Sequence, residues 1–531
     1  MQWLTGGALV IAVAMIAGLL GLVIAQGGST FWPRELVLLE RASGGPAMGE
    51  VEAEETFVPE GAGEPVRRRM LRTGNFELTG THYQWVADPE IREESRPEWA
   101  LVVERMSWGR FYGTPRALLV DGEPRASEPG PTLELFSEHH PQARERFERR
   151  RELETDAIGE VNHQFERERL DLRAVELESG LDSAPWKEAQ QRFQQRSQEL
   201  EQRFTEIGKD IDALNAENGR YQILLVTADG EEKRIPVAEI VRLYPANQLG
   251  TFEKIGVCVS RWMEFLLDVP REANSEGGVF PAIFGTVAMT LIMSILVVPF
   301  GVLAALYLRE YAKPGALVSI VRICVNNLAG VPSIVFGVFG LGFFCYIVGA
   351  SIDQLLFQER LPSPTYGKGG LLWASLTLAL LTLPVVIVAT EEALATVPGS
   401  MREGSYACGA TKWQTIHRIV LPRAMPGIMT GMILAVARGA GEVAPLMLVG
   451  AVKLAEKLPI DGVAPFVHPE RSFMHLGFHI YDLGFQSQNS EAAKPMVYTT
   501  TLLLIGIVVL LNVAAIWVRA RLRRRFAHAH I

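Results

Sequence analysis

Six long apolar runs constrain this chain more than any other feature of its sequence. Each is long enough to cross a hydrocarbon layer of about 30 Å as a helix. They lie at residues 4–25, 281–308, 317–349, 371–390, 427–450 and 497–518. With 48% hydrophobic and 21% charged residues over 531 positions, the chain is divided between membrane and water. We expect an all-α polytopic membrane protein with six transmembrane helices.

The first run, within residues 1–25, is interpreted as a retained anchor. Met1, Gln2 and Trp3 lack the positive charge with which a cleaved signal peptide begins. Basic residues in short connections then predict the orientation of the other runs. They lie in the tail 519–531, in the stretch 391–422 and directly after the second run. This pattern predicts a multi-pass protein of the cell inner membrane with both termini in the cytoplasm and residues 26–280 in the periplasm.

Residues 26–250 are expected to form a β-rich external domain. Its runs at 76–79, 99–103, 117–120 and 221–226 have the residue types of strands. Within it, a charged stretch at about 142–217 is predicted to form an antiparallel helical hairpin. Its apolar residues recur every seven positions at Phe193, Leu200, Ile207 and Leu214. This hairpin is either a solvated coiled coil without a ligand or a docking arm for an external partner.

Residues 251–279 are interpreted as an interfacial amphipathic helix followed by a linker. Apolar side chains at Phe252, Ile255, Val259 and Trp262 have the spacing of one helical face. Membrane lipid is therefore an expected partner. The net charge of −9 does not favour nucleic acid as a partner, and the basic tail is explained as a determinant of topology.

The polar stretch 391–422 separates the fourth and fifth apolar runs. Ser400 with Glu403, and Thr411 with Gln414, have the spacing of helix-capping boxes. We therefore expect two short helices separated by Gly409, the second of them ended by Pro422. On these features alone the stretch is either an ordinary surface loop or a docking surface for another protein.

A family resemblance favours the docking surface. The stretch contains Glu403-Gly404-Ser405, then three residues, Gly409, nine residues and Ile419-Val420-Leu421-Pro422. This pattern resembles the EAA loop of ABC-importer permeases, E-A-A-x3-G-x9-I-x-L-P. Gly404 and Ser405 replace its two alanines. The resemblance implies that this stretch docks on a separate ATP-hydrolysing subunit. The implied coupling residues are Glu403, Gly404, Ser405, Gly409, Ile419, Leu421 and Pro422.

Charged residues also occur within the apolar runs. Arg438 and Glu442 lie one helical turn apart in the fifth run, where a basic residue costs about 2.5–3.5 kcal/mol on insertion scales. They form either a static ion pair or a pathway site at which an anion competes with Glu442 for Arg438. Arg322, in the third run, is either a snorkelling side chain or a second polar lining.

Three segments of the chain carry a narrower resemblance: GVFPAIFGT (278–286), LAGVPSIVFG (328–337) and ARGAGEVAPL (437–446). They resemble the PstA family of phosphate-importer permeases. The resemblance covers about 278–518 and implies a type I ABC importer permease core of five helices over 280–518. It implies half of a pathway for inorganic phosphate, with Arg438, Glu442, Arg322 and Ser333 as pathway residues. The implied partners are a second homologous permease subunit, a dimer of ATP-binding subunits and an external phosphate-binding protein.

This chain is not expected to be an enzyme or to bind a cofactor itself. Gly367-Lys368-Gly369 lacks the spacing and the hydroxyl of a phosphate-binding loop, so ATP and Mg²⁺ are assigned to the partner ATPase. Two alternatives stay open at this point. The same fold could carry another oxyanion, molybdate or sulfate, or the chain could be a membrane signalling or scaffold protein.

Overall fold

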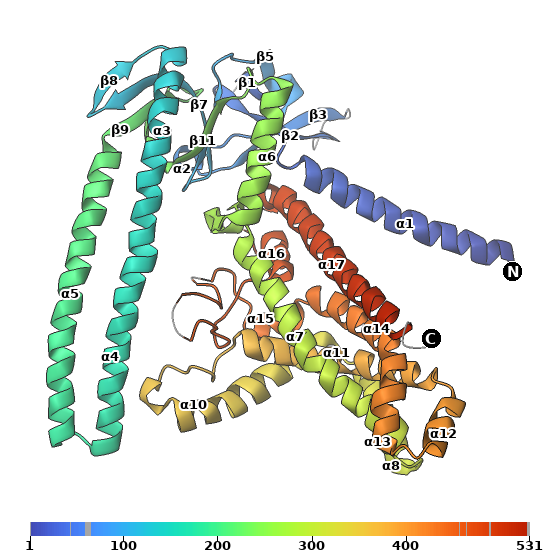
Figure 1. Cartoon of the computed structure of the whole chain (residues 1–531). Coiled ribbons are helices and arrows are strands. Elements are labelled where there is room, and N and C mark those ends of the chain that lie inside the picture. The colour runs from blue at the N-terminus through green and yellow to red at the C-terminus, as the bar shows by residue number, and fades with distance from the viewer. Residues whose placement is uncertain are drawn as a thin grey trace. The chain divides into compact units, whose positions relative to one another are not determined.

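The computed structural model describes residues 2–42, 44–58, 65–455, 457–462, 465–487 and 490–527. The chain folds as two compact units (Figure 1). The sheet unit is Phe31–Gly278, and the membrane unit combines Met1–Thr30 with Val279–Ile531. Helix α1 therefore belongs to the same unit as the helices near the C-terminus, although the whole sheet unit separates them in sequence.

Among its described residues, the sheet unit contains two large antiparallel sheets and a small two-stranded one near its C-terminal end. The first has the order β4-β3-β2-β1-β5 and the second β10-β9-β7-β6-β11, with β8 paired to β7. The strands of the first sheet are β1 Leu36–Arg41, β2 Ala47–Phe57, β3 Val66–Arg72, β4 Tyr83–Ala87 and β5 Ile91–Ser95. Those of the second are β6 Leu101–Arg105, β7 Arg110–Val120, β8 Glu123–Ala126, β9 Tyr221–Val226, β10 Glu232–Pro236 and β11 Ile240–Pro245.

Strand β6 is buried on both faces because successive side chains point to opposite sides of a sheet. Leu101 and Val103 pack into a core with Phe136 of helix α3 (Pro129–Glu152). Val102 packs into a second core with Tyr112 and other residues. All five residues of the strand are buried, and this explains why its sequence is a continuous apolar run that ends in two charged residues.

One predicted strand in this unit is wrong. Residues Phe76–Thr79 form the short helix α2, which follows Asn75 in a left-handed backbone conformation, φ 54°. The Asn75 side chain donates to the carbonyl of Tyr112 at 3.0 Å and accepts from its N–H at 2.8 Å. This contact with β7 holds the turn that starts α2, and a local pattern of strand-forming residues does not reveal it.

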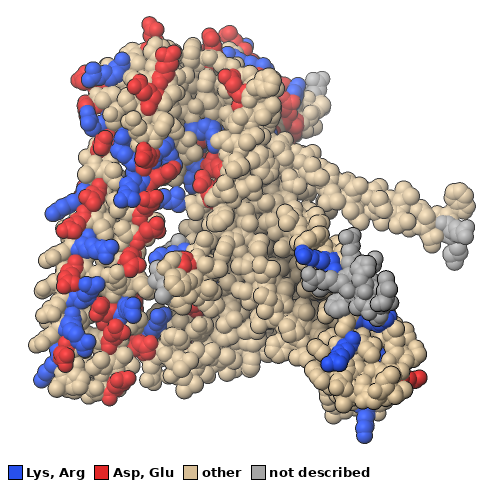
Figure 2. Space-filling view, in the orientation of Figure 1, with Lys and Arg blue, Asp and Glu red and all other residues tan. Residues whose placement is uncertain are grey.

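The helical hairpin is longer than its predicted range of about 142–217. Its first arm runs through α3, a π-helical turn at Leu153–Ala157 and α4 (Ile158–Ser179), and its second arm is α5 (Ala184–Gly219). Val161, Leu200 and Ile207 form the buried seam. Figure 2 shows Lys, Arg, Asp and Glu side chains spread along its outer surface. The first arm begins earlier than predicted because the start of α3 packs against the second sheet rather than against α5.

Six helices among the described residues are long and apolar enough to cross a membrane. They are Trp3–Ser29, Phe280–Tyr311, Ser333–Leu356, Leu371–Ala395, Lys412–Ala440 and Ala493–Arg521. The elements that build the membrane unit are α1 (Gln2–Ser29), α7 (Phe280–Leu306), α8 (Ala316–Leu328), α9 (Ser333–Phe339), α10 (Ala350–Leu356), α11 (Leu371–Ala395), α12 (Gly399–Ala407), α13 (Lys412–Thr415), α14 (Leu421–Ala440), α15 (Ala444–Val449), α16 (Leu476–Tyr481) and α17 (Ser490–Ala527).

The predicted third and fifth spans need correction. The run 317–349 is divided, because α8 ends at Leu328 and the span itself starts at Ser333 after the extended residue Pro332, ψ 137°. Hydropathy joins the two pieces since both are apolar. The fifth span begins at Lys412 and ends at Ala440 rather than covering 427–450, and α15 follows as a separate short helix.

Helices α7, α11 and α14 form the packed centre of the membrane unit. A Cβ at Gly301 of α7 would lie 2.6 Å from a methyl carbon of Val386 in α11, and one at Gly427 of α14 would overlap the Cβ of Ala393. Glycine at these two positions lets the three backbones approach closely, as in other membrane helix pairs. At its C-terminal end α1 meets α17, where the Thr499 hydroxyl donates to the Gly27 carbonyl at 3.1 Å.

Candidate functional site

The stretch 391–422 forms two short helices, as its sequence predicts. Helix α12 is separated from α13 by Gly409, whose φ of +80° is a left-handed conformation that favours glycine. The capping box of Thr411 and Gln414 is present, with 2.8 Å from the Thr411 N–H to Gln414 Oε1 and 3.3 Å from the Gln414 N–H to Thr411 Oγ1. The box predicted for Ser400 and Glu403 is absent, because α12 already starts at Gly399, directly after Pro398.

The expectation that Pro422 ends the second helix is also wrong. After α13 the chain makes a π-helical turn at Ile416–Val420 and continues as α14, with Pro422 at its second position. In the π-helical turn the Leu421 N–H donates to the Ile416 carbonyl, five residues before it, and this wider turn accommodates the following proline, which has no N–H. As a result, one span runs from Lys412 to Ala440 without a break.

Arg402 fastens α12 to the ends of two membrane helices. Its guanidinium donates to the carbonyls of Val397 at 2.7 Å and Leu394 at 3.0 Å, and to the carboxylate of Glu310 at 2.9 Å. Glu310 follows α7, and Leu394 belongs to α11. The sequence showed Arg402 only as one of several basic residues, since its partners are remote or are backbone atoms.

A second set of contacts joins the two short helices to each other and to the membrane unit. The hydroxyls of Ser405 and Thr415 lie 2.8 Å apart. Ile416 and Val420 are buried in a cluster with Leu394 of α11. The helix pair is therefore a fixed part of the membrane unit rather than a free loop.

The other side of this helix pair is open to solvent in this chain. Glu403, Gly404 and Gly409 are exposed, and Trp413 is 60% exposed and stacks on the His417 ring with 5.7 Å between centroids. We call this side the coupling face. The other predicted coupling residues, Ser405, Ile419, Leu421 and Pro422, are partly buried, so they belong to the support of the face rather than to its exposed surface.

Arg438 and Glu442 lie together, as predicted, but not on one continuous helix. Helix α14 ends at Ala440, and Glu442 lies in the turn before α15. Arg438 Nε is 3.7 Å from Glu442 Oε1, and the two side chains are 36% and 20% exposed. The pair therefore lies where the helix is interrupted, and both side chains remain partly exposed.

The structure separates Arg322 from this pair. Arg322 belongs to α8 and pairs at 3.2 Å with Glu391, in the last turns of α11. Ser333 starts α9, and one turn later a Cβ at Gly337 would lie 2.7 Å from the Cα of Pro445 in α15. Thus Ser333 lies on the helix that packs beside the break holding Glu442, whereas Arg322 does not.

The sequence reasoning missed two buried histidines, His475 and His479. His475 Nδ1 accepts from the Gly477 N–H at 3.1 Å, so its proton is on Nε2 in the neutral ring. In the described part of the chain, His475 Nε2 and both ring nitrogens of His479 have no hydrogen-bond partner. Burial lowers the pKa of His475 to about 3. Burial, opposed by nearby Asp482 and aided by Lys453, lowers the pKa of His479 to about 4.

Among the described residues, no three His, Cys, Asp or Glu side chains converge in a way that could hold a metal ion.

Comparison with known proteins finds similarities to part of this chain. The family model of "Binding-protein-dependent transport system inner membrane component" matches residues 297–528. A phosphate transport system permease protein, PstA 1, from Mycobacterium tuberculosis is 43% identical over 175 residues, which are 33% of this chain and 52% of that protein. PstA from Mycobacterium leprae is 43% identical over 191 residues, 36% and 56% of the two chains.

The matched region thus spans about half the length of these relatives. Among solved structures, a chain of the MetNI methionine ABC transporter in an inward facing conformation is 23% identical. It covers 45% of this chain and 94% of its own length, with a TM-score of 0.33.

Proposed function

We propose that this chain is the permease subunit of an ATP-driven ABC importer for inorganic phosphate, because the family model of binding-protein-dependent transport system inner membrane components matches residues 297–528. It forms half of the pathway and hydrolyses no ATP itself. The 43% identity to permeases named for phosphate transport supports the choice of substrate. The match leaves the sheet unit without a family assignment.

One observation carries the proposal. A single span, Lys412–Ala440, starts at the coupling face and ends beside the Arg438–Glu442 pair. A push on the coupling face is therefore transmitted along this one helix to the break at Gly441. At about 1.5 Å per residue, the 25 residues from Trp413 to Arg438 extend over roughly 38 Å, which is enough to connect the two sides of a bilayer.

In this mechanism the coupling face docks on a separate ATPase subunit, and two such subunits act on this chain and on a second permease subunit. ATP binding and hydrolysis rock the two halves, and phosphate delivered by an external binding protein passes between them. Arg438 attracts the anion, which competes with Glu442 for the guanidinium. We place the coupling face and both termini in the cytoplasm, and the sheet unit in the periplasm, in agreement with the basic residues of the short connections.

Uptake by cells that depend on this chain and its partner subunits tests the substrate. Radioactive phosphate, molybdate and sulfate are supplied separately at equal concentrations. Uptake of phosphate well above that of the other two supports the proposal. Preferred uptake of molybdate or sulfate would assign another oxyanion, and a complex that assembles but imports none of the three would favour a signalling or scaffold role.

A further inference from the structure

The helix that precedes the second span has one face fixed to the sheet unit. This helix, α6, is Thr251–Leu267. Its buried Arg261 donates to Glu104 Oε1 at 2.7 Å, to the Phe31 carbonyl at 3.1 Å and to the Tyr244 hydroxyl at 2.6 Å. Phe265 is fully buried against Phe31, with 5.3 Å between ring centroids. These contacts determine which side of α6 faces away from the sheets.

The opposite side of α6 exposes an uncharged stripe of large apolar side chains. Phe252 is 89% and Val259 is 55% exposed. The exposed apolar members of the stripe are Phe252, Ile255, Val259, Met263 and Leu267. At 100° per residue they and the exposed Gly256 and Ser260 occupy about 140° of the helix circumference. We call this side the apolar face of α6.

Charge is excluded from the apolar face although it is abundant on the rest of the sheet unit (Figure 2). The exposed charges next to it lie at its two ends. Glu253 is at the start of the helix, where its carboxylate accepts from the Gly250 N–H at 2.8 Å, and Asp268 directly follows Leu267. A contiguous exposed apolar patch of this kind marks a surface that binds a membrane or another protein.

The chain itself favours a membrane. After α6, strands β12 (Pro270–Arg271) and β13 (Glu276–Gly277) pair and return the backbone to the end of the helix, where the Gly278 N–H donates to the Val269 carbonyl at 3.0 Å. A side chain at Gly278 would collide with the carbonyl oxygen of Asp268. The second span begins only two residues later, at Phe280, and two residues extend over at most about 7 Å.

From this juxtaposition we propose that the apolar face of α6 lies in the boundary between headgroups and acyl chains of the bilayer that the span from Phe280 crosses. The buried contacts of Arg261 then hold the sheet unit on the membrane surface. This inference needs the span to cross a bilayer but does not depend on which solute is transported. Because the face carries no Lys or Arg, its binding comes from apolar burial and does not require anionic lipid.

Spin labels on the full-length chain test the proposal directly. Cys258, Cys324, Cys345 and Cys408 are first replaced by alanine or serine. A single nitroxide is then attached at Val259→Cys in the assembled complex, reconstituted in phosphatidylcholine vesicles with and without phosphatidylglycerol. Its collision rates with oxygen, which concentrates in lipid, and with a water-soluble nickel chelate are measured.

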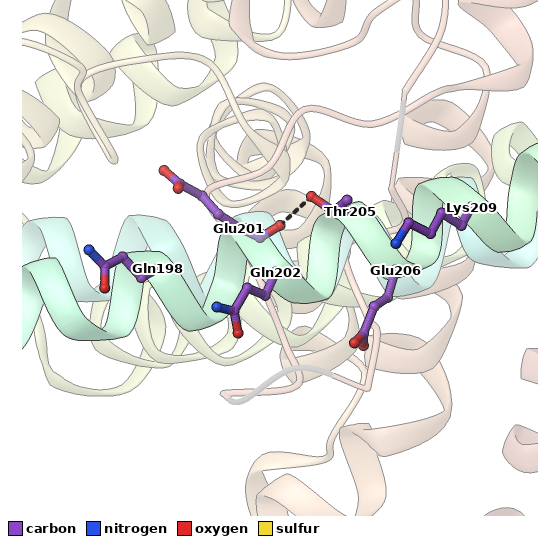
Figure 3. A pocket seen from close by; sticks show the side chains of 6 residues that line it. All are labelled: Gln198, Glu201, Gln202, Thr205, Glu206 and Lys209. Carbon is purple, nitrogen blue, oxygen red and sulfur yellow. Dashed lines mark hydrogen bonds between the residues drawn. The ribbon is translucent and has the colours of Figure 1, made fainter.

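A matched control label is placed at Gln202→Cys on α5. Gln202 is exposed beside a shallow surface hollow that only α5 side chains line, including Glu206 and Lys209 (Figure 3). This label should collide freely with the nickel chelate.

We expect the Val259 label to be several-fold more accessible to oxygen than to the nickel chelate, equally with both lipid mixtures. A label at Met263→Cys, one turn further, should give the same result. Free collision with the nickel chelate would show that the face lies in water. An immobilised label protected from both reagents would show that a protein covers it. Either result would overturn the proposal.

Discussion

Arg438 and Glu442 form an ion pair across the end of α14, with 3.7 Å between Nε and Oε1. In a continuous helix the two residues would be held by regular backbone hydrogen bonds, but here Gly441 and Val443 separate the ends of α14 and α15. A charge pair at a backbone break is easier to open than one on a rigid helix. This arrangement suits a site at which an arriving anion exchanges with a carboxylate.

Replacing Arg438 by alanine should reduce phosphate uptake while the complex still assembles. A hydrogen bond to a charged group contributes about 1.5–3 kcal/mol, so we expect a loss of roughly 10- to 100-fold in the ratio of maximal uptake rate to half-saturating concentration. Uptake kinetics and co-purification of the subunits are the measurements. Unchanged kinetics would reject a role of Arg438 in the pathway.

Replacing Glu442 by glutamine should act in the opposite direction on apparent affinity. The amide keeps the shape of the side chain but no longer competes with the anion for Arg438, so the half-saturating phosphate concentration should fall. The maximal uptake rate should also fall, because release of the anion slows. Initial uptake rates over a range of phosphate concentrations measure both. A raised half-saturating concentration would instead identify Glu442 as a structural support.

Gly409 can be tested through its backbone conformation alone. A Cβ there meets nothing within 4 Å, but φ is +80°, so valine is strained by about 1–2 kcal/mol whereas asparagine adopts this conformation readily. We expect Gly409→Val to abolish ATP-driven uptake and Gly409→Asn to retain much of it.

The matched control is Gly399→Ala in α12. A Cβ at Gly399 also meets nothing within 4 Å, and its φ is not positive, so uptake should be unaffected. Equal loss in the valine, asparagine and Gly399 variants would contradict the account, because it would point to general intolerance of the region rather than to the geometry at Gly409.

Arg402→Met should detach α12 from the ends of α7 and α11. The change leaves the carboxylate of Glu310 and two carbonyls without their donor, which costs about 1–3 kcal/mol per buried group. We expect the ATPase to co-purify poorly with this variant. Arg418, which is exposed on the same stretch, is the control. The ATPase should co-purify with the Arg418→Met variant better than with Arg402→Met and closer to the level of the unmodified chain.

Acid should weaken the membrane unit through His475 and His479. Both have folded pKa values below the ordinary value of about 6.5, so the unfolded chain binds more protons than the folded one. The contribution of the two neutral rings to the free energy of unfolding is fully present above about pH 6.5 and is lost as the pH falls towards about 4. At pH 5 the loss is up to roughly 2 kcal/mol per ring.

The measurement is the thermal unfolding midpoint of the detergent-solubilised chain at pH 7 and pH 5. The double variant His475→Gln, His479→Gln should show a smaller acid-induced decrease than the unmodified chain. His417→Gln, at an exposed position, serves as the control and should leave the decrease unchanged. An equal decrease in all three proteins would show that other groups determine the acid sensitivity.

Much of the membrane unit could be predicted because hydropathy reports directly on membrane helices, whose backbone polar groups must be satisfied internally. It failed where two helices are both apolar. The break between α8 and Ser333 is invisible to an average over residues, although Pro332 marks it. The expectation that a proline ends a helix failed at Pro422, where the preceding π-helical turn lets the helix continue.

Other features depend on contacts that no local pattern contains. The turn before α2 is set by Asn75 and the backbone of Tyr112, which are far apart in sequence. Arg402 and Glu310 are 92 residues apart in sequence, so no local pattern identifies their contact. The pairing of Arg438 with Glu442 was predictable because it is local, whereas the partner of Arg322, Glu391, was not.

The central claim is that a partner subunit hydrolyses ATP, acts on this chain at the coupling face and so drives phosphate past Arg438. Transport into vesicles tests this claim most directly. This chain is reconstituted with its second permease subunit and the ATPase subunits in vesicles that enclose ATP. The binding protein and radioactive phosphate are added outside, and the radioactivity that enters the vesicles is measured. We predict accumulation that requires ATP, is lost in Gly409→Val and is much weaker for sulfate and molybdate. Hydrolysis of ATP without phosphate accumulation, or equal accumulation of sulfate, would contradict the account.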